Sequence, residues 1–175
     1  MTVLPPLIAG IDVGGSKIAC AYLQGNSLVV DAYSSVFSHD RAKRLYNVCD
    51  HARRFGKFHQ TNYFFIEEPL VGRGIRASLQ VAQMAGAFML MMERVRYTDM
   101  MLVPVGTWKK LVVGLGNADK MTVSDWLEQN YPEFYEICGG NQDLIDATCI
   151  ALYGAEIVAQ SRSAELLGAN EQLHQ

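Results

Sequence analysis

Short apolar runs divide the first third of the chain into strand-sized pieces. The run 7–11 (LIAGI) leads into Asp12 and a glycine pair, and an apolar run of this length bounded by glycine predicts a buried strand. The stretches 17–24 and 27–34 flank a Gly-Asn pair, which predicts a hairpin with a tight two-residue turn. We therefore expect three antiparallel strands to open the fold.

Two longer stretches carry apolar residues at helical spacing. The stretch 39–57 predicts an amphipathic helix whose other faces are basic. The stretch 77–95 predicts a long, apolar, methionine-rich helix. Because so broad an apolar stripe at the edge of a small domain stays partly exposed unless a second copy covers it, we expect a homodimer with this helix at or near the interface.

Two more strands complete the predicted sheet. The stretch 62–69 (NYFFIEEP) is aromatic and β-branched and ends in two acids, and the helix before it makes it parallel to the first strand. The stretch 99–105 reads as a fifth strand. The pattern predicts an α/β fold with a mixed five-stranded sheet and helices on both faces.

The remaining stretch predicts shorter helices and then one long helix. Thr107 and Asn117 are candidate caps of two short helices around a glycine-rich loop, which would place Lys109 and Lys120 at helix starts. The stretch 132–137 shows no clear element. A helix is expected over 141–160 with Asn141 as its cap, followed by a polar tail over 161–175.

Length and composition limit the class of protein. At 175 residues and 50% hydrophobic content, the chain suits one domain, placed at 1–160, and is too short for two kinase lobes. It has no run of about 18 apolar residues and no basic signal-peptide start, so we expect a cytoplasmic protein with no membrane association. The four cysteines are scattered and predict reduced core thiols.

Charge is distributed unevenly along the chain. Residues 1–120 carry 14 Lys and Arg against 9 Asp and Glu, a net charge of +5, whereas residues 121–175 carry 1 against 9, a net charge of -8. This asymmetry suggests a basic binding face on the first part and an acidic end elsewhere. Ordinary solvated helix faces would explain the same counts.

Four carboxylates are expected to converge. Asp12 and Glu67 end two parallel strands, whose carboxyl ends lie side by side, and Asp143 and Asp146 lie on one face of a helix in its first turn. By strand alternation Glu68 points to the opposite face. Taken singly, these acids would be a turn cap and ordinary helix N-terminal acids. Together they would repel unless divalent cations bind among them, which suits two Mg²⁺ or Mn²⁺ ions roughly 3.5–4 Å apart in phosphodiester hydrolysis.

With these residues, the chain resembles the RuvC family of Holliday junction resolvases, within the ribonuclease H-like superfamily. The resemblance runs from GIDVG through FIEE, SLQVAQMAGA and KKLVVGLGNADK to QDLIDATCIAL. It implies a Mg²⁺-dependent endonuclease, with Mn²⁺ as a possible substitute, that nicks Holliday junctions or other branched DNA as a homodimer. The resemblance assigns metal binding and catalysis to Asp12, Glu67, Asp143 and Asp146. Lys120 joins the catalytic group, and DNA contact falls on Arg73, Arg76, Lys109, Lys110 and Lys120.

The chain departs from the family pattern at two positions. Val13 stands where the family usually has proline, and Leu70 stands where it often has an aromatic residue that stacks on junction bases. Relaxed cleavage of branched DNA, as in phage-encoded relatives, is therefore an alternative to strict four-way selectivity.

Two other classes of protein remain open at this point. The GIDVGGSK start also resembles a sugar kinase of the repressor and kinase family, although the chain lacks the zinc motif and the length of those proteins. A catalytically inactive DNA-binding module is the third reading, against which the retention of four acids and two lysines argues.

Overall fold

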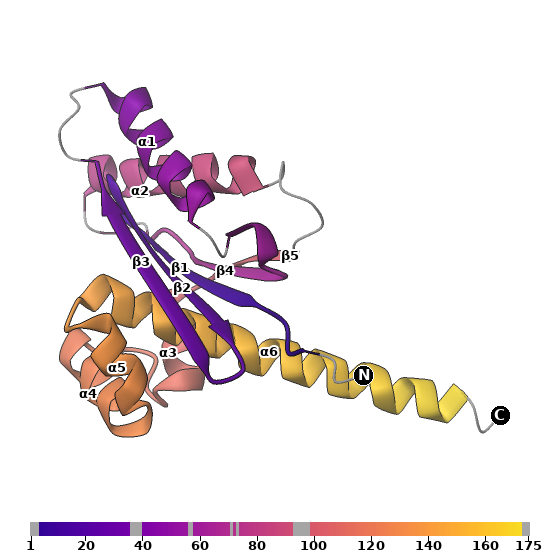
Figure 1. Cartoon of the computed structure of the whole chain (residues 1–175). Helices are drawn as coiled ribbons and strands as arrows, with labels where there is room; N and C mark the ends of the chain where they lie inside the picture. Colours follow the sequence, from indigo (N-terminus) through magenta and orange to yellow (C-terminus); the bar gives the residue numbers. More distant parts are fainter. Residues whose placement is uncertain are drawn as a thin grey trace.

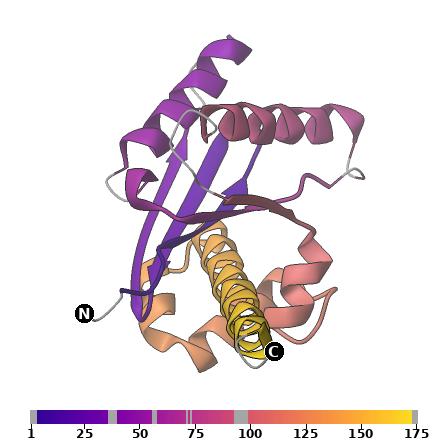
Figure 2. The ribbon, with the colours of Figure 1, turned by 90° about the vertical axis from the view of Figure 1, so that its right-hand side faces the viewer.

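A single mixed sheet lies between two layers of helices. The computed structural model describes residues 4–35, 40–55, 58–70, 72, 74–92 and 99–172. Helices α1 and α2 cover one face of the sheet, and α3 to α6 cover the other (Figures 1 and 2). The elements in chain order are β1 (Ile8–Val13), β2 (Lys17–Gln24), β3 (Ser27–Ser34), α1 (Arg41–Arg54), η1 (Phe58–Gln60), β4 (Tyr63–Glu67), α2 (Ile75–Met92), β5 (Asp99–Val103), α3 (Val105–Val112), α4 (Lys120–Asn130), α5 (Pro132–Cys138) and α6 (Gln142–Gln172).

The strand order is β3-β2-β1-β4-β5. Strands β1, β2 and β3 pair antiparallel through the predicted hairpin, whereas β4 pairs parallel with both β1 and β5. Gly25 has φ of 59° in the two-residue hairpin turn, a conformation that glycine adopts without steric cost. The predicted mixed five-stranded sheet with helices on both faces is confirmed.

Alternate residues of the central strands enter two separate cores. On β1, Ala9, Ile11 and Val13 join the core beneath α1 and α2. Ile8 joins the core beneath α6 and its neighbours, and Phe65 of β4 does the same. Since side chains alternate along a strand, Asp12 and Glu67 take the α6 face of the sheet.

Helix α6 lies against β1 at backbone contact. A Cβ atom at Gly10 would overlap backbone atoms of Ala147 and Ala151, and one at Gly154 would overlap the Phe65 ring. Small residues on both sides therefore allow the helix to lie close to the sheet. This close approach carries the first turn of α6 to the carboxyl end of β1.

The structure corrects several predicted boundaries. Helix α5 occupies the stretch in which the sequence showed no clear element; proline at its first position and Gly139 in the left-handed conformation at its end are ordinary helix signals. The caps of α3 and α4 are Pro104 and Asp119, so Thr107 and Asn117 were wrong. Lys109 consequently lies in the last turn of α3 rather than at a helix start.

The ends of the other helices differ less from the prediction. Helix α6 begins where expected, with Asn141 Oδ1 accepting from the Asp143 amide at 3.0 Å, but its backbone stays helical to Gln172, where a polar tail was expected. Helix α2 begins two residues early, and the expected end of that helix over 93–95 lies outside the described residues.

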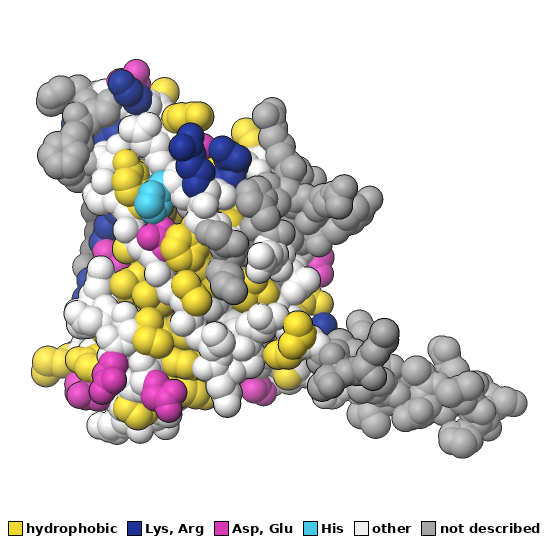
Figure 3. Space-filling model, viewed as in Figure 1, with side chains coloured by type: hydrophobic (Ala, Val, Ile, Leu, Met, Phe, Trp, Pro, Cys, Tyr) yellow, Lys and Arg dark blue, Asp and Glu magenta, His cyan; other side chains and the backbone are white. Residues whose placement is uncertain are grey.

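Basic and acidic side chains gather over different helices. On the face shown in Figure 3, Lys and Arg gather over the α1 side, where Arg53 and Arg54 lie in the last turn of that helix, and acids gather over the α4–α5 side. The four cysteines are all free and buried, as predicted. Among the helices of the described ranges, none is long and apolar enough to cross a membrane.

Candidate active site

The ends of β1 and β4 bring Asp12 beside Glu67. The register pairs Ile11 with Ile66, so the next residue of each strand is the acid. Both acids take the α6 face, whereas Glu68, one residue further on, is exposed. The exposure of Glu68 agrees with the strand alternation inferred from the sequence.

The first turn of α6 supplies Asp143 and Asp146. Their negative charges both raise the pKa of Asp12, which places them close to the strand acids. The N-terminus of a helix carries partial positive charge, and this makes two acids in that turn tolerable. The predicted group of four carboxylates is thus assembled from two strands and one helix.

Burial and mutual repulsion perturb the acids strongly. Burial, followed by the charges of Glu67 and Asp146, raises the pKa of Asp12 to about 8. Burial also raises the pKa of Glu67 and that of Asp146. Desolvation disfavours the charged form of a carboxyl, and nearby negative charge adds to this effect. Burial and mutual repulsion thus disfavour the ionised forms of these acids, and a bound cation would favour those forms.

Three of the acids are each held by a neighbouring donor. The indole Nε1 of Trp108 donates to Glu67 Oε2 at 3.1 Å, and the Gln142 amide donates to Asp146 Oδ1 at 2.9 Å. Asp143 Oδ2 forms an ion pair with the ammonium of Lys17. The three donors belong to three different elements, α3, α6 and β2.

Two lysines of the α3–α4 segment lie beside the acids. The positive charges of Lys109 and Lys120 lower the pKa of both Glu67 and Asp146, against the larger effect of burial. Lys109 Nζ donates to the Ala118 carbonyl at 2.6 Å and lies 5.4 Å from the centroid of the Trp108 ring. The loop between α3 and α4 thus brings cationic side chains to the edge of the acidic site.

The other predicted DNA contacts are less defined. Lys110 and Arg76 are exposed, on α3 and in the first turn of α2, and Arg73 lies outside the described residues. Neither Lys110 nor Arg76 is among the charges that shift the pKa of Asp12, Glu67 or Asp146.

The donor set fits a hard divalent cation, because it consists of carboxylate oxygens that repel one another. In the part of the chain that is described, no three His, Cys, Asp or Glu side chains are arranged as joint ligands of one ion. Glu67 and Asp146 can keep their hydrogen bonds from Trp108 and Gln142 and still offer an oxygen to a cation, because an ionised carboxylate has about four acceptor sites.

Sequence reasoning missed Lys17, Trp108 and Gln142. Lys17 was visible as the last residue of GGSK, but only the structure shows which acid it reaches. Trp108 neighbours Lys109 in a segment identified for its lysines, and its contact with Glu67 spans 41 residues of sequence. Gln142 precedes the acids by one and four positions, so its bond to Asp146 is an ordinary helical pair at i,i+4.

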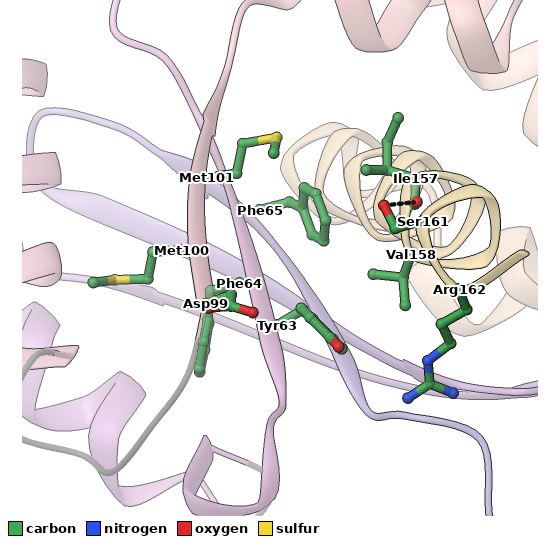
Figure 4. Close-up of a pocket in the computed structure, with 10 residues that line it drawn as sticks. All are labelled: Tyr63, Phe64, Phe65, Asp99, Met100, Met101, Ile157, Val158, Ser161 and Arg162. Atoms are coloured by element: carbon green, nitrogen blue, oxygen red, sulfur yellow. Dashed lines mark hydrogen bonds between the residues drawn. The ribbon is translucent and has the colours of Figure 1, made fainter. Parts of the chain in front are cut away.

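A groove of about 460 Å³ lies at the other end of the sheet (Figure 4). Tyr63 and Asp99, the first residues of β4 and β5, line it together with Ile157, Val158 and Arg162 of α6. Glu67 lies at the opposite end of β4. The groove is therefore separate from the acidic site.

A mixed sheet with acids at the ends of its central strands and on the last helix packed against it is typical of nucleases of the ribonuclease H-like class. The family model described as "Crossover junction endodeoxyribonuclease RuvC" matches residues 8–152. The chain belongs to this family of metal-dependent Holliday junction resolvases.

Solved structures with the same fold include RuvC of Thermus thermophilus, with a TM-score of 0.70 and 17% identity over 89% of this chain and 96% of that one. The T. thermophilus RuvC complex with Holliday junction substrate gives a TM-score of 0.67 and 18% identity, again over 89% and 96%. The Fowlpox virus resolvase complex with Holliday junction DNA gives 0.51 and 14%, over 85% and 98%. No curated protein matches the chain.

Proposed function

We propose that Asp12, Glu67, Asp143 and Asp146 bind two Mg²⁺ ions, for which Mn²⁺ can substitute, and that the chain nicks four-way junctions and other branched DNA there. The observation that carries the proposal is the convergence of these acids: burial and then the charges of Glu67, Asp146 and Asp143 raise the pKa of Asp12 to about 8. A bound divalent cation would relieve the repulsion among buried acids of this kind. The match to the RuvC family over residues 8–152 supports the assignment and supports placing the nuclease domain at 1–160.

The protein side chains have distinct roles in the proposed hydrolysis. When bound, the two ions activate a water and stabilise the leaving oxygen. Trp108 holds Glu67 by its indole N–H and excludes water from one side of that acid, since its own side chain is fully buried. Lys120, at the exposed start of α4, is placed to contact the scissile phosphate, and Lys109 adds positive charge beside it.

The proposed DNA surface includes exposed basic residues of α2 and α3. Arg76 and Lys110 are exposed on α2 and α3, and they would contact phosphates together with Arg73. Such contacts carry affinity but no sequence information, and they weaken with salt. Leu70, three residues after Glu67, is 67% exposed; it offers apolar contact but no aromatic ring for stacking on bases. This supports relaxed selection among branched structures.

We also propose a homodimer with α2 at its interface, because two symmetric nicks in a four-way junction require two sites. The methionines of α2 do not form the exposed part of this helix, since Met84 and Met92 are buried in the core. The exposed stripe consists instead of Ile75, Leu79 and Leu90, which are 79%, 57% and 70% exposed. An apolar stripe of this extent favours a protein contact.

Incubation of the purified protein with labelled four-way, three-way and linear duplex DNA tests the proposal. With Mg²⁺ we expect nicks in the branched substrates and little cleavage of the linear duplex. Asp146→Asn keeps the side-chain shape and removes one charge, so it should bind junctions without cutting them. If the wild-type protein bound branched DNA but cleaved none of it with Mg²⁺ or Mn²⁺, the chain would be an inactive binding module.

A further inference from the structure

Lys17 places a positive charge inside the acidic site. It is the first residue of β2, and its ammonium pairs with Asp143 Oδ2 on α6, 126 positions away in sequence. The same charge also acts on Asp12, whose ionised form it stabilises. Lys17 therefore interacts electrostatically with both Asp12 on β1 and Asp143 on α6.

The turn between β1 and β2 directs this side chain. The Gly14 amide donates to the Lys17 carbonyl at 3.0 Å, which closes the turn. A Cβ atom at Gly14 would lie within 3 Å of Cγ and Cε of Lys17. The lysine stem thus crosses the space that a side chain at Gly14 would fill, and the glycine is what leaves its path to Asp143 open.

The ion pair between Lys17 and Asp143 can break as well as form. The Lys17 side chain is 48% exposed and that of Asp143 is 27% exposed, so the ammonium can move into water when its partner is taken. Asp143 is also one of the acids proposed to hold a metal ion. An ammonium and a divalent cation at the same carboxylate oxygens repel each other, so the two states exclude one another.

We propose that Lys17 is a built-in counter-ion of the acidic site, which holds Asp143 in the metal-free protein and is displaced from it when a divalent cation binds. The proposal rests on the proposed function, because it takes Asp143 as a metal ligand. The metal-free site is stabilised by its own lysine, and metal binding includes the loss of that pair.

The expected change in divalent-cation affinity follows from the competition between Lys17 and the cation for Asp143. A ligand that binds only the open form has its apparent affinity reduced by the fraction of protein in that form. A partly exposed ion pair is worth up to about 1 kcal/mol, or about fivefold, and removal of a cation from the site adds to this. We expect removal of the Lys17 charge to tighten divalent-cation binding about two- to tenfold.

Calorimetric titration of Mn²⁺ into the DNA-free protein tests this without use of nuclease activity. Lys17→Met should bind Mn²⁺ two- to tenfold more tightly than wild type, whereas Lys43→Met, which removes the same charge from the exposed surface of α1, should bind as wild type does. Unchanged or weaker binding by Lys17→Met overturns the proposal, and so does the absence of binding in both proteins. Weaker binding would show that the lysine helps to hold the metal.

Two further measurements separate displacement from a general effect on the fold. Lys17→Gln, which keeps a polar side chain, should show the same tightening, and both variants should retain the circular dichroism spectrum of wild type. Without metal, Lys17→Met should lower the melting temperature in the wild-type background, because it removes the ion pair with Asp143. In an Asp143→Asn background the same change should not lower it. If it lowered that temperature as much as in the wild-type background, the pair would have no special role and the proposal would fail.

The outcome for Lys17 is distinct from the outcome for nuclease activity. A wild-type protein that cleaves branched DNA, with no difference in Mn²⁺ affinity in Lys17→Met, rejects the counter-ion and leaves the nuclease. A wild-type protein that binds Mn²⁺ but cleaves no DNA rejects the nuclease, and the ratio of the two Mn²⁺ affinities still decides the role of Lys17.

Discussion

The indole of Trp108 donates a hydrogen bond to Glu67 Oε2 at 3.1 Å from a fully buried position. This bond favours the charged form of Glu67 and so opposes the effect of burial, which raises the pKa of that acid. The bond links a side chain of α3 directly to the end of β4. Trp108 is therefore a positioning residue for one of the proposed metal ligands.

Trp108→Phe removes the donor and keeps most of the apolar volume. The pKa of Glu67 should rise further, so the pH at which junction cleavage reaches half its maximum should move upward. The measurement is the pH profile of junction cleavage. Trp126→Phe, a tryptophan change in α4 away from the acids, should leave the profile in place, and an unshifted profile in Trp108→Phe would remove this bond from the mechanism.

Asp12 makes the metal-free protein sensitive to pH. Its pKa is about 8 in the folded chain and near 3.8 as a free side chain, so the folded state binds the proton more tightly and loses stability as pH rises between these values. Asp12→Asn should therefore stabilise the protein at pH 8 in EDTA by about 1–3 kcal/mol, and by less at pH 5. Urea unfolding at both pH values measures this. Equal effects at the two pH values would contradict the raised pKa.

Glu67 and Glu68 are adjacent in sequence, but Glu67 is half-buried at the acidic site and Glu68 is exposed, which allows a matched pair of substitutions. Glu67→Gln should reduce cleavage by more than the roughly 10- to 100-fold lost when only a hydrogen-bond partner of a ligand is removed. Glu68→Gln should leave cleavage within about twofold of wild type, because surface substitutions of this kind have small effects. Single-turnover cleavage of a four-way junction compares them, and the reverse order of effects would show that the assignment of Glu67 is wrong.

Arg41 joins three elements near the β1–β2 turn. Its guanidinium donates to the carbonyls of Gly15 and Gln80 and, at 3.1 Å, to Gln83 Oε1 on α2. Arg41→Met should cost about 1–3 kcal/mol in unfolding free energy, because it leaves partly buried acceptors without their donor, and should slow cleavage by loosening the turn after Asp12.

Denaturant unfolding and cleavage rates together test the role of Arg41. Arg54→Met is the matched control, since that arginine is 70% exposed and pairs with Asp50 on the same helix. Equal stability losses in the two variants would assign no special role to Arg41.

The exposed stripe of α2 predicts the assembly state. Leu79→Lys places a charge in the proposed interface and should convert the dimer to a monomer at micromolar concentration, with no loss of fold. Sedimentation velocity measures this. Ile137→Lys, at a position 46% exposed on α5, should stay dimeric. A wild-type monomer that still cleaves junctions would remove the dimer from the mechanism.

The sheet could be predicted from the sequence because its signals are local. Alternation along the strands and the Gly-Asn turn fix the hairpin, and the helix between β1 and β4 fixes their parallel pairing. The same reasoning places Asp12 beside Glu67 and on the opposite face from Glu68. Helix α5 was missed although Pro132 and Gly139 mark its ends, because its seven residues are too few for a periodic pattern.

The finer chemistry of the site could not be predicted, because it depends on contacts distant in sequence. Nothing around Trp108 indicates that its indole reaches Glu67, and nothing around Lys17 indicates that it crosses Gly14 toward α6. The positions of Lys109 and Lys120 were identified from their spacing. Their approach to Glu67 and Asp146 follows from how α3 and α4 pack, which spacing alone does not determine.

The contact between Gly10 and α6 gives the site a fixed size. The gap between the strand acids and the helix acids is set by backbone against backbone, because a Cβ atom at Gly10 would overlap Ala147 and Ala151. Rotamer changes can turn a carboxylate within this gap, but they cannot widen it. Any larger residue at Gly10 would lift the first turn of α6 away from Asp12. The absence of a side chain at Gly10 therefore sets the distance between the strand acids and the helix acids.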